Sequence, residues 1–186
     1  DNIIWATINA IAEIETNAIM YSNSHSFTYV ASNRYGTNIS VADSGIGFKE
    51  SFSDAGRKLK MVEKFQNVQH KFQNYLILMS ALNYSYEKHI KDKREDLWTL
   101  RTNIINNNGI FKIQYENTQV IFSCNRCRGC RKIEGAKDIA PCVQCLMDKY
   151  SMDMYSPIKI FNIGFQGVRI EITINRETSY EKSTIN

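Results

Sequence analysis

The sequence predicts an α+β fold, a sandwich in which helices pack on one face of a sheet. The order of the patterns indicates this class: a helix, two strands, further helices, then a hairpin and closing strands. Apolar residues at Ile4, Ile11 and Ala18 recur every seven positions, which predicts a helix over residues 2–21. At 186 residues and 43% hydrophobic, the chain is long enough for one ordinary domain.

Alternating apolar and polar side chains, together with turn residues, predict the strands and helices that follow. Short strands are expected at residues 27–31 and 38–42, and the second runs directly into the turn Asp43-Ser-Gly-Ile-Gly47. Residues 50–91 are helix-prone, with a more apolar segment at 75–82, and predict helices joined by loops.

The second half of the chain begins with a further set of apolar residues at the spacing of a helix. Leu97, Leu100 and Ile104 define it, and Asn106-Asn-Asn-Gly109 should end it because glycine is a favourable C-terminal cap. A hairpin with its turn at Asn117-Thr118 and closing strands over 158–163 and 168–174 should follow. The polar tail 175–186 is expected to be flexible.

The amino-acid composition indicates what kind of ligand the protein binds and where in the cell it is found. The net charge of +4 fits an anionic ligand and falls short of a strongly basic nucleic-acid binder, so nucleic acid is not favoured. No apolar run approaches the ~20 residues of a membrane span, and a cytoplasmic protein without membrane attachment is expected. Because the chain opens at Asp1 within a helical pattern, we expect an excised domain with an attached domain or protein partner.

Two motifs in a fixed order predict a pocket for a nucleotide and its metal. The first is Glu13-x-x-x-Asn17-Ala18, in which the polar residues lie four apart and so share one helix face. The second is Asp43-x-Gly45-x-Gly47, at the end of a predicted strand. Together they resemble the GHKL ATP-binding fold, also called the Bergerat fold or histidine-kinase-like ATPase domain. The resemblance covers residues 1–174 apart from a cysteine insert, and implies a two-layer α/β sandwich with a mixed sheet.

The resemblance also implies roles for single residues. Asn17 would bind Mg²⁺ through its amide oxygen, a hard ligand that suits this ion. Glu13 would be the catalytic carboxylate that orients or deprotonates the attacking water. Asp43 would accept a hydrogen bond from the adenine amino group, while Gly45 and Gly47 let the backbone curve around the base.

Three further residues resemble nucleotide contacts of the same family. Ser85 and Lys88 match the stretch that leads into the phosphate lid, where a hydroxyl and a cation face the phosphates. Gly167 matches the closing strand beside the adenine, although Val168 stands where the family often has threonine.

The chain departs from the family at the phosphate lid. A glycine-rich loop is expected there, but this chain reads Lys93-Arg-Glu-Asp-Leu-Trp98 and has no glycine between Gly56 and Gly109. Asp96 also adds a negative charge near the expected phosphates. The prediction is therefore an ATP- and Mg²⁺-binding module that hydrolyses ATP slowly or acts as a nucleotide-dependent switch. Protein histidine kinase activity is less supported, since no phosphoacceptor helix is visible.

Five cysteines lie close together and predict a zinc site. Cys124-x-x-Cys127-x-x-Cys130 and Cys142-x-x-Cys145 contain two knuckle spacings within an insert over residues 124–150. The expected zinc ligands are Cys124, Cys127, Cys142 and Cys145, with Cys130 as the alternative. A second hypothesis for the whole chain follows from this insert: a zinc-ribbon nucleic-acid or protein adaptor whose nucleotide pocket is vestigial.

Overall fold

The computed structural model describes residues 2–22, 24–92, 96–123, 133, 136–150 and 156–175. The helices are α1 (Asn2–Ser22), α2 (Gly47–Asp54), α3 (Lys60–Lys64), α4 (Gln73–Asp92), α5 (Leu97–Asn106) and α6 (Ala140–Asp148), with a short 3-10 helix η1 (His70–Phe72) before α4. The strands are β1 (Ser26–Asn33), β2 (Gly36–Asp43), β3 (Ile110–Ser123) and β4 (Ile158–Asn175). The predicted tail lies outside the described residues from 176 onward.

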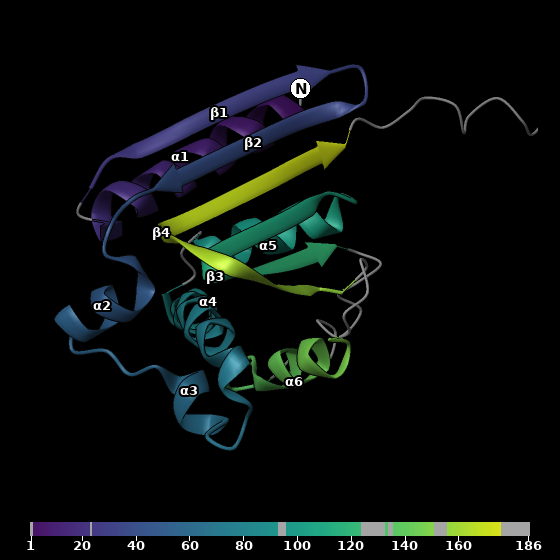
Figure 1. Ribbon diagram of the computed structural model, residues 1–186. Coiled ribbons are helices and arrows are strands. Elements are labelled where there is room, and N and C mark those ends of the chain that lie inside the picture. The colour runs from purple at the N-terminus through teal and green to yellow at the C-terminus, as the bar shows by residue number, and fades with distance from the viewer. Residues whose placement is uncertain are drawn as a thin grey trace, which may run out of the picture.

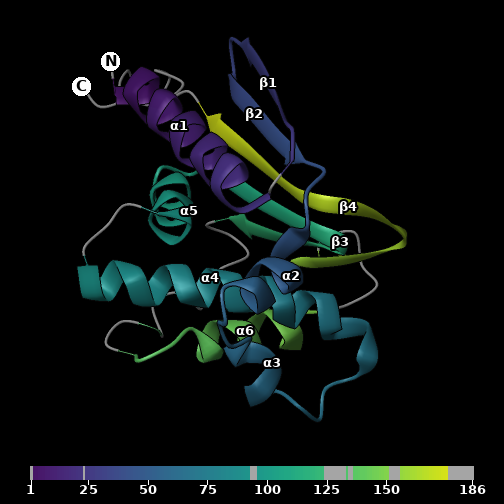
Figure 2. The same ribbon diagram turned by 90° about the vertical axis from the view of Figure 1, so that its left-hand side faces the viewer.

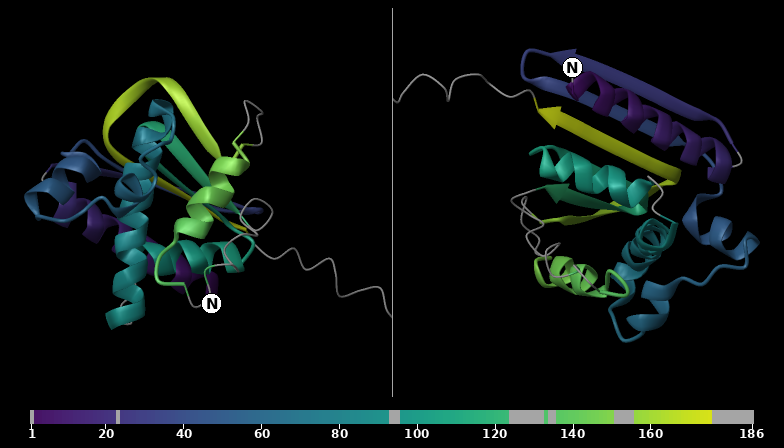
Figure 3. Two further views of the ribbon diagram at one scale, coloured as in Figure 1. Left: turned by 90° about the horizontal axis from the view of Figure 1, so that it is seen from below. Right: turned by 180° about the vertical axis from the view of Figure 1, so that it is seen from behind.

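The strands form one sheet in the order β1-β2-β4-β3, with the helices across one of its faces (Figure 1, Figure 2). Seen from the helical side, α1 lies over β1 and β2 and α5 lies over β3 (Figure 3). The α+β class and the single helical layer agree with the sequence prediction. Within the described part of the chain no helix is both long and apolar enough to cross a membrane.

The prediction of a mixed sheet is wrong for the described strands. All three neighbouring pairs are antiparallel. Strands β2 and β3 do run in the same direction, but β4 lies between them and runs opposite to both. No parallel pair can therefore form among these strands.

The core lies between the sheet and the helices. On the helical face, Val41 of β2 and Ile113 of β3 flank Ile170 of β4, and all three are buried. Helix α4 supplies the other half of the core through the continuous buried segment 75–82. On the opposite face of the sheet, Glu171 forms ion pairs with its neighbours on β3 and β4. The alternation of apolar and charged residues along β4 therefore fixes which face the helices cover.

The predicted hairpin at Asn117-Thr118 is also wrong. Strand β3 continues from Ile110 to Ser123, and both halves pair with the long strand β4. The pairing register shifts on either side of Glu116, whose φ of 52° is in the left-handed region. The extra residues at these shifts belong to β4, because Glu116 pairs with Phe165 and Thr118 already pairs with Ile160. The turn residues therefore stay within β3, and the irregularity bends the strand pair without ending the pairing.

The helix ends predicted from sequence are confirmed where they can be compared. Helix α1 covers residues 2–22, and α5 ends at Asn106, just before the predicted cap. There the Gly109 N–H donates to the carbonyl of Ile104 at 2.8 Å, which satisfies a carbonyl of the last turn.

Candidate functional site

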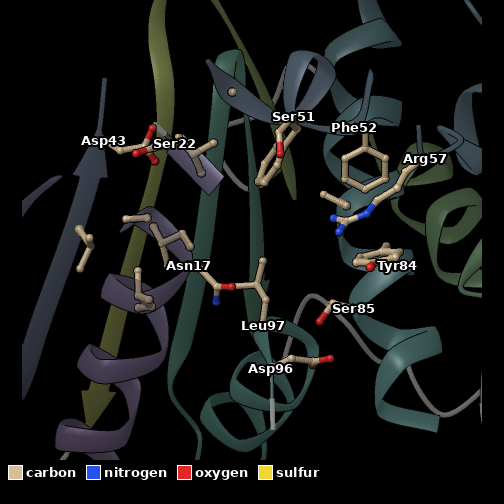
Figure 4. Close-up of a pocket in the computed structure, with 18 of the residues that line it drawn as sticks. Asn17, Ser22, Asp43, Ser51, Phe52, Arg57, Tyr84, Ser85, Asp96 and Leu97 are labelled. Carbon is tan, nitrogen blue, oxygen red and sulfur yellow. The ribbon is translucent and has the colours of Figure 1, made fainter. Parts of the chain in front are cut away.

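A cavity lies where α1, the end of β2, α2 and α4 meet (Figure 4). Residues from six elements and one loop line it: Ile14, Asn17, Ala18 and Ser22 of α1; Val41 and Asp43 of β2; Gly47, Phe48, Ser51 and Phe52 of α2; Arg57; Ala81, Tyr84, Ser85 and Lys88 of α4; Asp96 and Leu97 at the start of α5; and Val168 and Ile170 of β4. Five of the predicted nucleotide-site residues are therefore brought together: Asn17, Asp43, Gly47, Ser85 and Lys88.

The enclosed volume is about 120 Å³, and the space continues into open solvent. Sites for drug-sized ligands usually measure about 300–1,000 Å³. The enclosed part can therefore hold only a small portion of such a ligand, and any larger ligand would extend toward the open mouth.

Asp43 forms one end of the cavity and is only 8% exposed. Its Oδ1 accepts the Gly45 N–H at 3.0 Å, and its carboxylate also accepts the Val168 N–H. Burial raises the pKa of Asp43 above its usual value, and the two backbone hydrogen bonds lower it again in part. These contacts hold a buried carboxylate in a fixed position on an otherwise apolar wall.

Two glycines outside the cavity lining allow the backbone to pack closely around Asp43. A Cβ on Gly167 would lie 2.0 Å from the Asp43 carbonyl oxygen, and the φ of Gly167 is +99°. A Cβ on Gly45 would lie 2.1 Å from the carbonyl oxygen of Ser22 at the end of α1. Close backbone packing thus requires glycine at both positions, independently of any ligand.

Asn17 lies between the ends of the cavity and is tied to the predicted catalytic carboxylate. Its Nδ2 donates to Glu13 Oε1 at 3.0 Å, one helical turn earlier. Glu13 itself is outside the cavity lining. Because the hydrogen bond uses the amide nitrogen, the amide oxygen of Asn17 is left for a ligand or metal.

The other end of the cavity contains an aromatic ring flanked by two cations. The Arg57 guanidinium carbon lies 4.5 Å from the centre of the Tyr84 ring, and Lys88 Nζ lies 4.7 Å from the same centre. All three residues line the cavity. Lys88 was predicted from the sequence, whereas Arg57 and Tyr84 were not. The spacing of Tyr84 and Lys88, four apart on a helix, was a usable signal, whereas nothing local in the sequence joins Arg57 to them.

Ser85 and Asp96 hold the start of α5. Ser85 Oγ accepts the Trp98 N–H at 2.7 Å, and Asp96 Oδ1 accepts the N–H groups of Trp98 and Thr99 at 3.1 and 3.3 Å. Asp96 is therefore the N-cap of α5, where a negative charge is stabilised by the helix dipole. The N-cap gives this carboxylate a structural role, and the expectation that its negative charge also opposes phosphate binding stays a prediction. The lid residues Lys93 to Glu95 lie outside the described residues.

The second cysteine pair lies on a helix. Cys142 and Cys145 are in α6, where Cys142 is 1% exposed within the hydrophobic core and Cys145 is half-buried. Cys124, Cys127 and Cys130 lie outside the described residues. In the ranges that are described, no three His, Cys, Asp or Glu side chains are grouped to hold a metal. Cys142 and Cys145 are thus one helical turn apart, and the zinc site itself remains a prediction.

Helix α6 and the residues before it are attached directly to α4. The Tyr75 hydroxyl donates to the Val143 carbonyl at 2.9 Å, and the Ile139 N–H donates to the buried Asn83 Oδ1 at 3.1 Å. The described part of the insert therefore packs against the helix that carries Tyr84 and Lys88.

Comparison of the chain with protein-family models, with curated proteins and with solved structures finds no match in any of the three.

Proposed function

We propose that the chain is an ATP- and Mg²⁺-binding module of the histidine-kinase-like ATPase type, which hydrolyses ATP slowly or uses nucleotide binding as a switch for a partner. One observation carries the proposal: Asn17, Asp43 and Lys88, from three elements far apart in the sequence, line the same cavity. An acceptor, a metal ligand and a cation are the groups needed for the base, the Mg²⁺ ion and the phosphates.

The Asp43 end suits a purine base. Its walls include the buried side chains of Ile14, Val41 and Ile170, which offer apolar surface to a flat ring. The Asp43 carboxylate can accept a hydrogen bond from an exocyclic amino group. A buried acceptor discriminates strongly, because a ligand that lacks the donor leaves it unpaired.

Asn17 and Glu13 suit the metal and the water. The Asn17 amide oxygen is a hard ligand of the kind Mg²⁺ accepts beside water and phosphate oxygens, and the bound ion would neutralise phosphate charge. Glu13, held to Asn17 by a hydrogen bond, is the carboxylate that can orient or deprotonate the attacking water. Its place outside the lining agrees with a role toward water more than toward the base.

The test is calorimetric titration of ATP with Mg²⁺ into the wild type, Asp43→Ala and a matched control, Asp148→Ala. Asp148 is an exposed acid at the end of α6, away from the cavity lining. Wild type and control should bind equally, and Asp43→Ala should bind at least about tenfold more weakly, the loss expected for a hydrogen bond to a charged group.

Each alternative result has a defined meaning. If the wild type does not bind, the proposal is wrong and the adaptor hypothesis is favoured. If Asp43→Ala binds as tightly as wild type, Asp43 does not contact the base. Hydrolysis is tested separately with Glu13→Gln, which should retain binding and lose phosphate release.

We propose in addition that the insert binds one structural Zn²⁺ through Cys124, Cys127, Cys142 and Cys145, with Cys130 as the alternative ligand. The i, i+3 spacing of Cys142 and Cys145 on α6 puts them on one helix face, which is compatible with two ligands of a tetrahedral site. Metal analysis of the purified chain should give one zinc per chain, lowered by Cys145→Ser. Retention of full zinc in Cys124→Ser with loss in Cys130→Ser would select the alternative ligand.

A further inference from the structure

We propose that Arg57, Tyr84 and Lys88 form a phosphate-binding subsite made of side chains, which takes the place of the glycine-rich lid that this sequence lacks. The proposal rests on the proposed nucleotide function and assigns the polyphosphate chain to a specific end of the cavity.

The position of the three residues is the first argument. Figure 4 shows Asp43 on one side of the cavity and Arg57 with Tyr84 on the opposite side, with Asn17 between them. The Arg57 side chain reaches over the Tyr84 ring toward the interior. A nucleotide with its base at Asp43 would run past the metal ligand Asn17 and present its phosphates to the two cations.

The backbone holds Arg57 at this end of the cavity. Helix α2 ends in a Schellman motif, in which the Gly56 N–H donates to the Ser53 carbonyl at 2.9 Å and the Arg57 N–H donates to the Phe52 carbonyl at 2.8 Å. Gly56 has a φ of +60°, which suits the residue after the helix. The turn fixes the backbone of Arg57 against the last turn of α2, so its side chain starts from a defined point.

The aromatic ring organises the two charges. Tyr84 and Lys88 lie four apart on α4 and share one face of the helix. Because both cations contact the same ring, they lie within about 9 Å of each other, the sum of their two distances to its centre. The ring stabilises each cation on its own. Both cations therefore belong to the same end of the cavity, where a phosphate group would interact favourably with each of them.

Two acidic side chains near Lys88 are paired with other groups, so Lys88 can bind phosphate. The nearby Lys60 forms an ion pair with Glu87 at 2.7 Å, whereas none of the ion pairs found between described residues includes Lys88. Asp96 is engaged with the N-terminus of α5. Side-chain cations can neutralise phosphate where backbone amides of a glycine loop are missing.

The test compares three probes: Mg²⁺ with ATP, adenosine, and Mg²⁺ with inorganic triphosphate. Each is titrated into the wild type, Arg57→Gln, Lys88→Gln and the control Lys60→Gln, which loses the same charge outside the cavity lining. Thermal melting of each variant checks that it folds. If Arg57→Gln does not fold, the test is made with Lys88→Gln alone.

Both cavity variants should bind ATP and triphosphate about tenfold or more weakly than the wild type, which is the expected loss for a charge-assisted hydrogen bond. Adenosine affinity should stay within about twofold in all proteins, and Lys60→Gln should match the wild type.

Failure of this subsite and failure of the nucleotide function give different results. If ATP and adenosine bind the wild type and neither cavity variant weakens ATP, the subsite is wrong while nucleotide binding stands. If adenosine and ATP do not bind but triphosphate does, and Arg57→Gln or Lys88→Gln abolishes it, the subsite stands as an anion site and the nucleotide function is wrong. Binding of none of the probes contradicts both.

Discussion

The two ends of the cavity are built by different means. At the Asp43 end, backbone packs on backbone: glycines touch the carbonyls of Asp43 and Ser22, and two N–H groups fix the carboxylate. At the Tyr84 end, long side chains from a turn and a helix meet around one ring. The first end is therefore rigid and specific in shape, whereas the second provides charge that can adjust to a ligand.

This difference predicts how substitutions act. A change at the Asp43 end should affect folding as well as binding, because a single added carbon collides with the main chain. Replacing Arg57 or Lys88 at the Tyr84 end should affect binding more than folding, because a shorter side chain there adds no overlap with the main chain.

Gly167→Ala should lower the free energy of unfolding by about 3 kcal/mol or more, since it adds both backbone strain and overlap with the Asp43 carbonyl. For a chain of this size that is a decrease in Tm of at least about 6 °C. The matched control is Gly56→Ala, also at positive φ but with no atom within 4 Å of the added Cβ, which should cost about 1–2 kcal/mol. Equal losses in the two variants would show that the close contact at Asp43 contributes nothing.

The charge of Asp43 should make stability depend on pH. Burial raises the pKa of Asp43 in the folded state above the usual 3.8, so the folded protein binds this proton more tightly than the unfolded chain. Stability contributed by Asp43 is then greatest below pH 3.8 and decreases as the pH rises toward the folded-state pKa. Denaturant unfolding at several pH values should show wild type losing stability relative to Asp43→Asn above about pH 4. A constant difference between the two proteins would contradict a raised pKa.

Two substitutions of Asp96, at the Tyr84 end of the cavity, distinguish its structural role as an N-cap from the effect of its negative charge on ligand binding. Asp96→Ala should cost about 1 kcal/mol, typical for loss of an N-cap, which is a decrease in Tm of about 2–4 °C. Asp96→Asn keeps an efficient cap and should melt close to wild type. Without the negative charge it should bind Mg²⁺ and ATP severalfold more tightly. Weaker binding in Asp96→Asn would place this carboxylate on the metal instead.

The smallest effect is expected for the ion pair between Lys60 and Glu87, which is partly exposed to solvent. Glu87→Gln should change the free energy of unfolding by less than about 1 kcal/mol. A larger loss, measured by urea unfolding, would mean that this pair helps to position α4 and hence Tyr84.

Local patterns predicted the Asp43 end and much of the fold. Helix α1, strands β1 and β2 and the end of α5 follow from periodicity and from turn residues close in sequence. The motif residues Asn17 and Asp43 do meet at one cavity. Such features are readable because glycine, a buried strand and a helix face are each defined within a few residues.

Long-range packing decides what the sequence did not reveal. Asn117 and Thr118 have a turn composition, yet β4 is long enough to pair on both sides of them and a bulge results. Arg57 meets Tyr84 only because α2 and α4 pack at the same cavity, a contact that no local pattern contains. The antiparallel sheet likewise depends on β4 entering between β2 and β3.

The central claim is that the two ends bind two parts of one ligand. A crystal structure with a non-hydrolysable ATP analogue and Mg²⁺ tests it most directly. We expect the adenine amino group within hydrogen-bond distance of Asp43, the metal on the Asn17 amide oxygen, and the outer phosphates on Arg57 and Lys88. A base stacked on Tyr84, with phosphates directed away from both cations, would contradict it.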